Sequence, residues 1–365
     1  MDFFVTHVSE RSRVLAGEVL ASEWLSEGAK VREFEAALAS RLGLASPVCV
    51  NSGTSALHLS LAVAGVGPGD EVIIPAQTFV ATGLAVLMVG ATPVFADINP
   101  RTGNISPLSV QGRITDRTRA VIPVHWAGYP CDMAEILEVC RDNQIAVIED
   151  AAHALGAEYR GRPVGSLSRF TCFSFQAIKH LTTGDGGALC CLDEGDASRA
   201  RAIRWFGIDR AKSKPSLLGE REFDLTELGF KYHMNDVAAA IGLGNIETLE
   251  GRLARRREIA TIYRRELSHV PGLALLDSSP DRIHAYWLFT VLVENRAAFI
   301  RKLASQGIPS SVVHLRIDRY SIFGGIRDSL PGQDDFESRQ VAIPVHERLS
   351  GEQVESVIGA IRAGW

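Results

Sequence analysis

The chain of 365 residues has no long uninterrupted apolar run. No stretch approaches the roughly 20 apolar residues that a membrane-spanning helix needs. The first residues, MDFFVTHVSERSRV, also lack the basic segment and longer apolar segment of a secretory leader. We therefore expect a soluble protein located in the cytoplasm.

Cysteine pairs with metal-binding or redox spacing are also lacking. None of the six cysteines forms a Cys-x-x-Cys pair, and none has a histidine partner at zinc spacing. Most lie inside apolar runs, so we expect buried free thiols and no metal site. A net charge of -5 gives no general reason to bind nucleic acid or an anionic membrane.

Short apolar runs alternate with helix-like stretches between about residues 45 and 190. This alternation predicts an α/β fold with a mostly parallel sheet covered by helices. The runs expected to be strands are PVCVNSG, EVIIPA, TPVFADI, RAVIPVHW, IAVIEDAA, FTCFSF and GALCCL.

A second, smaller domain is expected after a long amphipathic helix over roughly 246–268. It would contain a strand in AYWLFTVLV, a helix in AAFIRKLASQ and a final helix that Ser350 can cap, which is an α+β pattern. We therefore predict domains at 1–248 and 249–365. The arginines of the long helix are expected to form a solvated face, because acidic residues interleave with them.

Three loops at strand ends carry the residues that could bind a ligand or take part in catalysis, because ligands bind at the carboxyl ends of parallel strands. In NSGTSALHL, Gly53, Thr54 and Ser55 open a helix and would offer a phosphate seat; a plain helix cap is the alternative. In EDAAHALGA, Asp150 ends a buried strand and would need a cationic partner. Asp150 could instead simply cap the following helix. His153 could instead be an ordinary core or helix residue.

The third loop, FSFQAIKHLTTGDGG, places Lys179 after residues that look buried. A lysine held there would be neutral, paired or covalently bound. Ser174 could reach a phosphate, and the glycines let the backbone fold closely around a ligand. A phosphate cradle, an acid, a lysine and a flat side chain are what pyridoxal phosphate requires, so we expect that cofactor.

At this point the sequence resembles the sugar aminotransferases of the DegT/DnrJ/EryC1/StrS family, within the type I (aspartate-aminotransferase) fold of pyridoxal-phosphate enzymes. The resemblance covers nearly the whole chain. It is carried by WLSEGAKVREFEAALA, NSGTSALHLSL, GPGDEVIIPAQTFVAT, GATPVFADINP, IPVHWAG, IEDAAHALGA, FSFQAIKHLTTGDGG and GFKYHMNDVAAAIGL.

The resemblance implies a role for individual residues. Lys179 would be the Schiff-base lysine and Asp150 the partner of the pyridine nitrogen, with Thr54, Ser55 and Ser174 on the phosphate. Phe79 matches the aromatic residue that stacks on the cofactor ring. Asn235 matches a residue that reaches the phosphate from a second subunit, which implies a homodimer with a shared site.

Three parts of the chain depart from the family pattern or leave a role open. His153 stands where many members have glutamine near the cofactor's phenolic oxygen. Members often carry an HYxPLH-like stretch where this chain reads VVHLRIDRYSIFGG, which leaves the roles of His314, Arg316 and Tyr320 open. His125 could face the site or be a core histidine bonded to backbone.

The resemblance implies transfer of an amino group from an amino acid, L-glutamate in most relatives, to a keto group of a nucleotide-linked deoxysugar. The family's sugar dehydratases have histidine at the position of Lys179, which argues against that activity. A regulator that binds the cofactor without turnover is an alternative from another class. A dinucleotide-binding oxidoreductase is a third, but no G-x-G-x-x-G follows the first strand.

Overall fold

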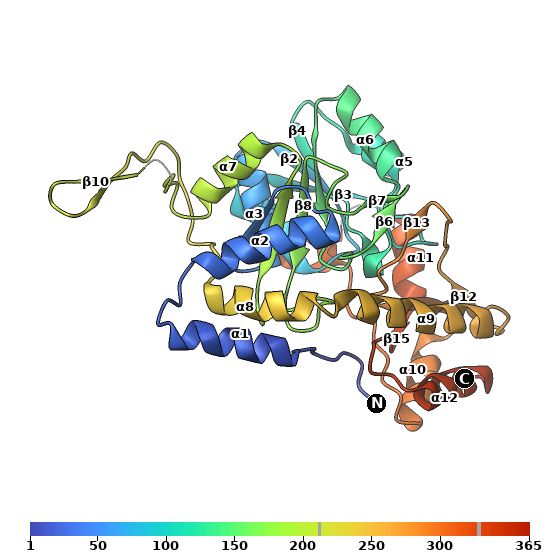
Figure 1. The fold of residues 1–365 in the computed structure, drawn as a ribbon. Coiled ribbons are helices and arrows are strands. Elements are labelled where there is room, and N and C mark those ends of the chain that lie inside the picture. The colour runs from blue at the N-terminus through green and yellow to red at the C-terminus, as the bar shows by residue number, and fades with distance from the viewer. Residues whose placement is uncertain (211–212, 327–329) are drawn as a thin grey trace.

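A seven-stranded sheet forms the centre of the computed structural model, which describes residues 1–210, 213–326 and 330–365 (Figure 1). The strand order is β1-β9-β8-β5-β4-β2-β3. β9 runs antiparallel to both of its neighbours, and the other neighbouring pairs are parallel. The strands are β1 (Pro47–Val50), β2 (Glu71–Pro75), β3 (Thr92–Ala96), β4 (Thr118–Val121), β5 (Ala146–Asp150), β8 (Phe170–Ser174) and β9 (Gly187–Cys191).

Helices cover both faces of this sheet, as its continuously apolar strands require. Successive side chains of β2 show the division: Ile73 packs into one hydrophobic cluster, and Val72 and Ile74 pack into another. The first cluster includes α2 (Ala29–Leu42), α5 (Pro107–Arg113), α6 (Met133–Asp142) and α8 (Asp236–Ile246); the second includes α3 (Gly53–Val63), α4 (Val80–Met88) and α7 (Glu194–Ile203). The predicted α/β fold and its seven strands are confirmed.

The C-terminal part has a smaller antiparallel sheet and a hydrophobic cluster of its own. The expected long helix begins after the end of α8, and Figure 1 shows it leading toward the last helices. Ser350 caps the final helix in a capping box with Gln353, as predicted. The elements are α9 (Leu249–Leu267), β12 (Leu273–Leu275), β14 (Phe289–Val293), α10 (Arg296–Ser305), β15 (Gln340–Ile343) and α12 (Gly351–Arg362).

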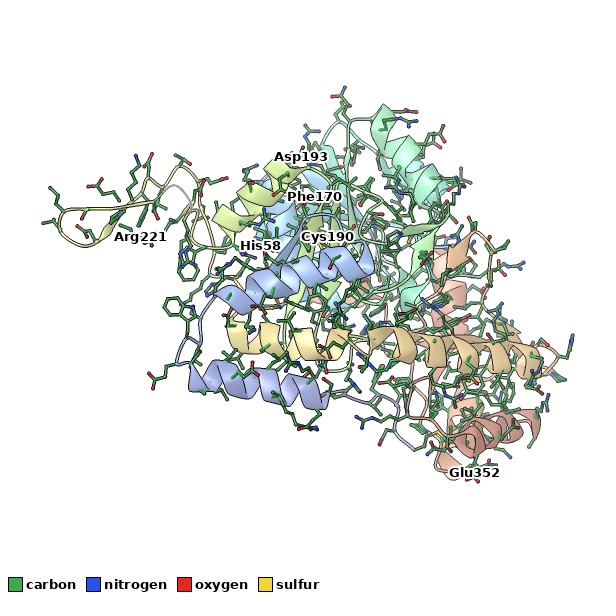
Figure 2. All side chains as sticks on the ribbon, viewed as in Figure 1. His58, Phe170, Cys190, Asp193, Arg221 and Glu352 are labelled. Atoms are coloured by element: carbon green, nitrogen blue, oxygen red, sulfur yellow. The ribbon has the colours of Figure 1, made fainter. Side chains whose placement is uncertain are left out.

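A hairpin arm, residues 213–225, projects from the body of the protein (Figure 1). Figure 2 shows Arg221 on this arm, far from Phe170 and Cys190 in the sheet. Leu217 and Leu218 on the arm are fully or almost fully exposed. The remaining elements are α1 (Glu10–Ala21), β6 (Glu158–Tyr159), β7 (Arg162–Pro163), β10 (Lys214–Pro215), β11 (Arg221–Glu222), β13 (Arg282–Ile283), α11 (Pro331–Arg339) and the 3₁₀ turns Trp126–Gly128, Ile317–Arg319 and Ser321–Phe323.

The cysteines agree with the expectation from the sequence. All six cysteines are buried free thiols. No group of metal-binding side chains occurs within the described ranges. In the same ranges, the helices are too short or too polar to cross a membrane.

The arginine-rich face of α9 differs from the prediction, because part of it points into the protein. Arg252 donates to the carbonyl of Asn245, at 2.9 Å, and is almost completely buried. Arg256 donates to the carbonyl of Val345 and pairs with Glu347 at 3.1 Å. These guanidinium groups satisfy carbonyl oxygens between elements, so a solvated face was the wrong interpretation for them.

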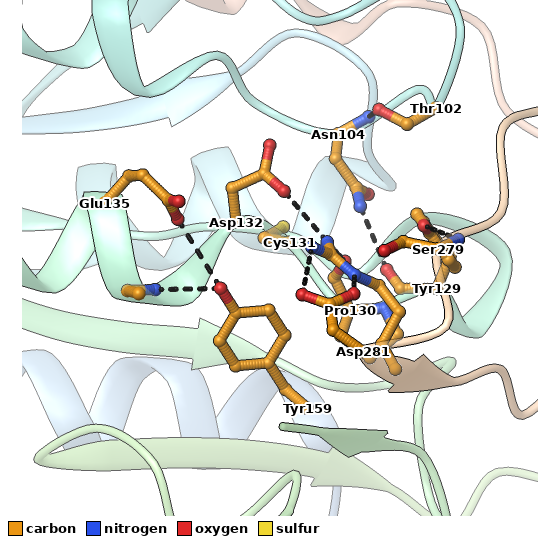
Figure 3. A network of polar contacts seen from close by, with 12 residues as sticks. Thr102, Asn104, Tyr129, Pro130, Cys131, Asp132, Glu135, Tyr159, Ser279 and Asp281 are labelled. Carbon is orange, nitrogen blue, oxygen red and sulfur yellow. Dashed lines mark hydrogen bonds and ion pairs between the residues drawn. The ribbon is translucent and has the colours of Figure 1, made fainter. Parts of the chain in front are cut away.

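A polar network joins β13 to the loop that follows the first 3₁₀ turn (Figure 3). Arg282 donates to the carbonyl of Pro130 and to the carboxylate of Asp132, both at 2.9 Å. In the same network, the Tyr129 hydroxyl accepts a hydrogen bond from the amide of Ser279 at 3.0 Å. The network fixes the chain just before Trp287, and this residue enters the site described next.

Candidate active site

A cavity of about 360 Å³ lies where the loops after β1, β5 and β8 meet. The structure brings together seven of the nine residues predicted for the site. These lining residues are Gly53, Thr54, Phe79, Asp150, His153, Ser174 and Lys179. They come from four separate stretches of sequence, so the cavity exists only in the folded chain.

Lys179 follows the buried Phe173 and Phe175 of β8 and its continuation, and its side chain enters the cavity partly buried. Burial lowers the pKa of Lys179 to about 7, and the charge of Asp150 only partly opposes that effect. A large share of the amine is therefore neutral at neutral pH. A neutral amine is the form that attacks an aldehyde.

Asp150 is the last residue of β5, and its carboxylate is buried beside the cavity. Its Oδ2 accepts a hydrogen bond from the Thr82 hydroxyl at 2.8 Å, and its Oδ1 accepts one from the amide of Ala152 at 3.2 Å. Burial raises the pKa of Asp150 despite these bonds. Within the described ranges no basic side chain forms an ion pair with this carboxylate, so it can take a cationic partner from a ligand.

His153 is buried and stacks on the indole of Trp287, with ring centroids 3.8 Å apart. Burial and the nearby Lys179 lower the pKa of His153 well below its usual value, so the ring is neutral. Its Nδ1 is buried and has no hydrogen-bond partner in the part of the chain that the structure describes. His314 also lines the cavity, and burial lowers its pKa to about 4.

The loop after β1 begins α3 as expected, with the Ser52 hydroxyl accepting the amide of Ser55 at 3.0 Å. Gly53 is required here because an added Cβ would lie 2.9 Å from the Cβ of Ser174. Thr54 and Ser174 line the cavity. The Ser55 hydroxyl instead donates to Asn51 at 2.6 Å and does not line the cavity.

Phe79 and Asn235 were both expected near the cofactor. Phe79 lines the cavity, and Asn235 does not. The ring of Phe79 lies 5.2 Å from that of His314 at the cavity and is 54% exposed. Asn235 caps α8 by accepting the amide of Ala238, is exposed, and lies outside the lining of the cavity in its own chain.

Three residues whose roles the sequence left open lie outside the cavity lining. His125 is fully buried and donates from Nε2 to Glu149 at 2.8 Å, because its Nδ1 accepts the amide of Cys131. Arg316 is buried in an ion pair with Asp318 at 2.6 Å. Tyr320 is 41% exposed at the surface.

Sequence reasoning missed Thr82 and Trp287. Thr82 belongs to the quoted QTFVAT segment, but nothing in that segment indicates that its hydroxyl reaches the end of β5. Trp287 stands in AYWLFTVLV, which was interpreted only as a strand. Its proximity to Lys179 depends on a long-range contact that no local pattern reveals.

The residues present fit pyridoxal phosphate. Among the described residues, the cavity combines a lysine with a lowered pKa, a buried carboxylate that forms no ion pair and an imidazole nitrogen that has no hydrogen-bond partner. The close approach of Gly53 to Ser174 leaves amides and hydroxyls at the start of α3 for a phosphate.

Comparison with known proteins agrees with this fit. The chain is 36% identical to the GDP-perosamine synthase of Caulobacter vibrioides over 97% of its length and 94% of that protein. It superimposes on the sugar aminotransferase CalS13 of Micromonospora echinospora with a TM-score of 0.95, 36% identity and full coverage of both chains. The PLP form of Spr1654 of Streptococcus pneumoniae gives a TM-score of 0.92 at 29% identity, covering 100% of this chain and 98% of that one.

These matches confirm the type I fold, the cofactor and the reaction class. The chain is a pyridoxal-phosphate-dependent sugar aminotransferase. The model of the DegT/DnrJ/EryC1/StrS aminotransferase family matches residues 7–362. The chain belongs to the DegT/DnrJ/EryC1/StrS aminotransferase family.

Proposed function

We propose that this enzyme moves an amino group from L-glutamate to the keto group of a nucleotide-linked 3-keto or 4-keto deoxysugar, for the synthesis of a deoxyaminosugar. The observation that carries the proposal is that Lys179 and Asp150 line one cavity. The name of the Caulobacter vibrioides relative includes GDP, which supports a nucleotide-linked acceptor.

Lys179 is the proposed catalytic base and the attachment point of the cofactor. When bound, pyridoxal phosphate supplies an aldehyde that takes up the amino group and a ring that draws electrons from the donor's α-carbon. The free ε-amine of Lys179 would remove the proton from that α-carbon. A pKa of about 7 keeps a large share of the amine free to accept the proton.

Asp150 and His153 are proposed to act on the cofactor ring. The carboxylate of Asp150 would hold the proton on the ring nitrogen, since a buried carboxylate is stabilised by a cation. Neutral His153 would donate or accept a hydrogen bond at the phenolic oxygen through its ring nitrogens. Thr54, Ser174 and the amides at Gly53 would bind the phosphate, with Ser55 supporting the loop, and Phe79 would cover the ring.

We also propose how the subunits associate, where the domains divide and where the enzyme is located. Two copies would form a homodimer in which Asn235 reaches the partner's phosphate, which fits the position of Asn235 outside its own cavity. The exposed leucines of the hairpin arm support a protein partner. The separate core of the C-terminal part supports domains at 1–248 and 249–365. We place the enzyme in the cytoplasm.

The visible absorption spectrum before and after addition of L-glutamate tests the proposal, with Lys179→Ala beside the natural protein and Lys231→Ala as an exposed lysine control. We expect a yellow band that glutamate bleaches in the natural and control proteins and that is missing in Lys179→Ala. Nucleotide-linked keto sugars should then restore the band. A band that no amino donor bleaches would favour the non-catalytic regulator instead.

A further inference from the structure

Trp287 is a fully buried tryptophan beside the proposed catalytic lysine. The Nζ atom of Lys179 lies 3.7 Å from the centre of its indole ring. An ammonium group over an indole face is attracted by the electrons of the ring, and tryptophan is the best aromatic residue for this contact. The lysine therefore has a defined resting place on one wall of the cavity.

Trp287 is held by hydrogen bonds from both its indole N–H and its backbone amide. Its N–H donates to the carbonyl of Ile178, the residue directly before Lys179, at 3.0 Å. Its backbone amide donates to the carbonyl of Ala127 at 2.8 Å. The same side chain thus holds both the backbone and the amine of the lysine.

Further aromatic contacts prevent the indole from turning. His153 stacks on it with centroids 3.8 Å apart and planes 15° apart, and Phe4 stacks at 5.1 Å and 23°. Ile178 and Phe4 pack into the same hydrophobic cluster as Trp287. A ring packed in this way keeps one position, because buried side chains interdigitate closely.

We propose that Trp287 is a positioning residue for Lys179, with its ring holding the ε-amine at the cavity and its N–H fixing the adjoining backbone. The proposal rests on the catalytic role of Lys179 proposed above. As a catalytic base, the free ε-amine of Lys179 would have to stay close to the α-carbon of the donor. A fixed ring against which the free amine packs keeps it within reach of the reacting carbon.

The test compares Trp287→Met, which removes the ring, with Trp287→Phe, which keeps an aromatic face but no N–H. Trp126→Met is the matched control. Trp126 is equally buried in the same cluster and does not line the cavity. Its indole nitrogen has no hydrogen-bond partner among residues 1–210, 213–326 and 330–365. The readouts are the visible circular dichroism of the bound cofactor per unit absorbance, the rate of band formation when cofactor is added to cofactor-free protein, and kcat.

We expect Trp287→Met to lower kcat about tenfold or more and to weaken the dichroism, because the lysine loses its fixed position. Trp287→Phe keeps a ring face but loses the hydrogen bond to Ile178, so it should keep most of the dichroism and lose less of kcat than Trp287→Met, and Trp126→Met should keep both. Equal losses in Trp126→Met would overturn the proposal, as would a Trp287→Phe protein that loses the dichroism completely. Natural protein that forms no visible band would refute the role of Lys179 itself, whereas a Trp287→Met protein with natural dichroism, rate of band formation and kcat would refute only the role of Trp287.

Discussion

The hydroxyl of Thr82 donates a hydrogen bond of 2.8 Å to Oδ2 of Asp150. The oxygen of Thr82 also lies 2.6 Å from that of Thr78, so a short chain of hydroxyls supports the carboxylate from α4 and the loop before it. A carboxylate held in this way cannot rotate freely. Its position at the end of β5 therefore does not depend on a bound ligand.

Asp150→Asn should bind the cofactor but transfer amino groups slowly. An amide cannot hold the ring-nitrogen proton as a carboxylate does, so we expect kcat to fall about 100-fold or more. Asp277→Asn, which alters an exposed ion pair with Arg101, should leave kcat unchanged. Single-turnover rates with glutamate measure the loss. A rate within twofold of the natural enzyme, which corresponds to about 0.4 kcal/mol, would refute the role of Asp150.

Capture of the cofactor should depend on pH through Lys179. Because burial lowers the pKa of this lysine to about 7, only a minor fraction of the amine is neutral below that pH. The rate of band formation in cofactor-free protein should therefore rise about tenfold per pH unit below pH 7 and level off above it. Stopped-flow absorbance between about pH 5.5 and 9 measures the profile. This range extends about one and a half pH units or more on each side of the pKa of Lys179.

The variant Asp150→Asn can distinguish titration of Lys179 from titration of the cofactor itself. The negative charge of Asp150 raises the pKa of Lys179. The midpoint of the profile should consequently move to lower pH in Asp150→Asn. A midpoint that stays near the ordinary lysine value in both proteins would contradict the assignment.

Gly53→Ala should weaken cofactor binding. The added Cβ would lie 2.9 Å from the Cβ of Ser174, so β8 and the start of α3 would have to separate at the proposed phosphate seat. We expect the dissociation constant to rise about tenfold, which corresponds to about 1.4 kcal/mol. Gly17→Ala is the control because an added Cβ there meets no atom of the described residues within 4 Å. Fluorescence titration of the cofactor-free proteins would show the difference, and equal affinities would argue against this seat.

Local patterns in the sequence predicted the strands of the main sheet and the loops that follow β1, β5 and β8. This succeeded because a buried parallel strand is a short apolar run, and the ligand site of such a sheet lies at its carboxyl edge. The contacts of Thr82 and Trp287 could not be predicted in this way. Each depends on how distant elements pack, and the same limit explains why Arg252 and Arg256 were placed in solvent.

The hairpin arm should be necessary for association of two copies. Leu217 and Leu218 project with almost no cover from their own chain, and large exposed leucines mark surfaces that bind a partner. Light scattering should give the mass of a dimer for the natural protein and a larger share of monomer for the double variant Leu217→Ser and Leu218→Ser. Leu108→Ser, which changes another highly exposed leucine away from the arm, should stay dimeric. If Asn235 completes the partner's site, the monomeric variant should also bind the cofactor more weakly, and a fully active monomer would contradict a shared site.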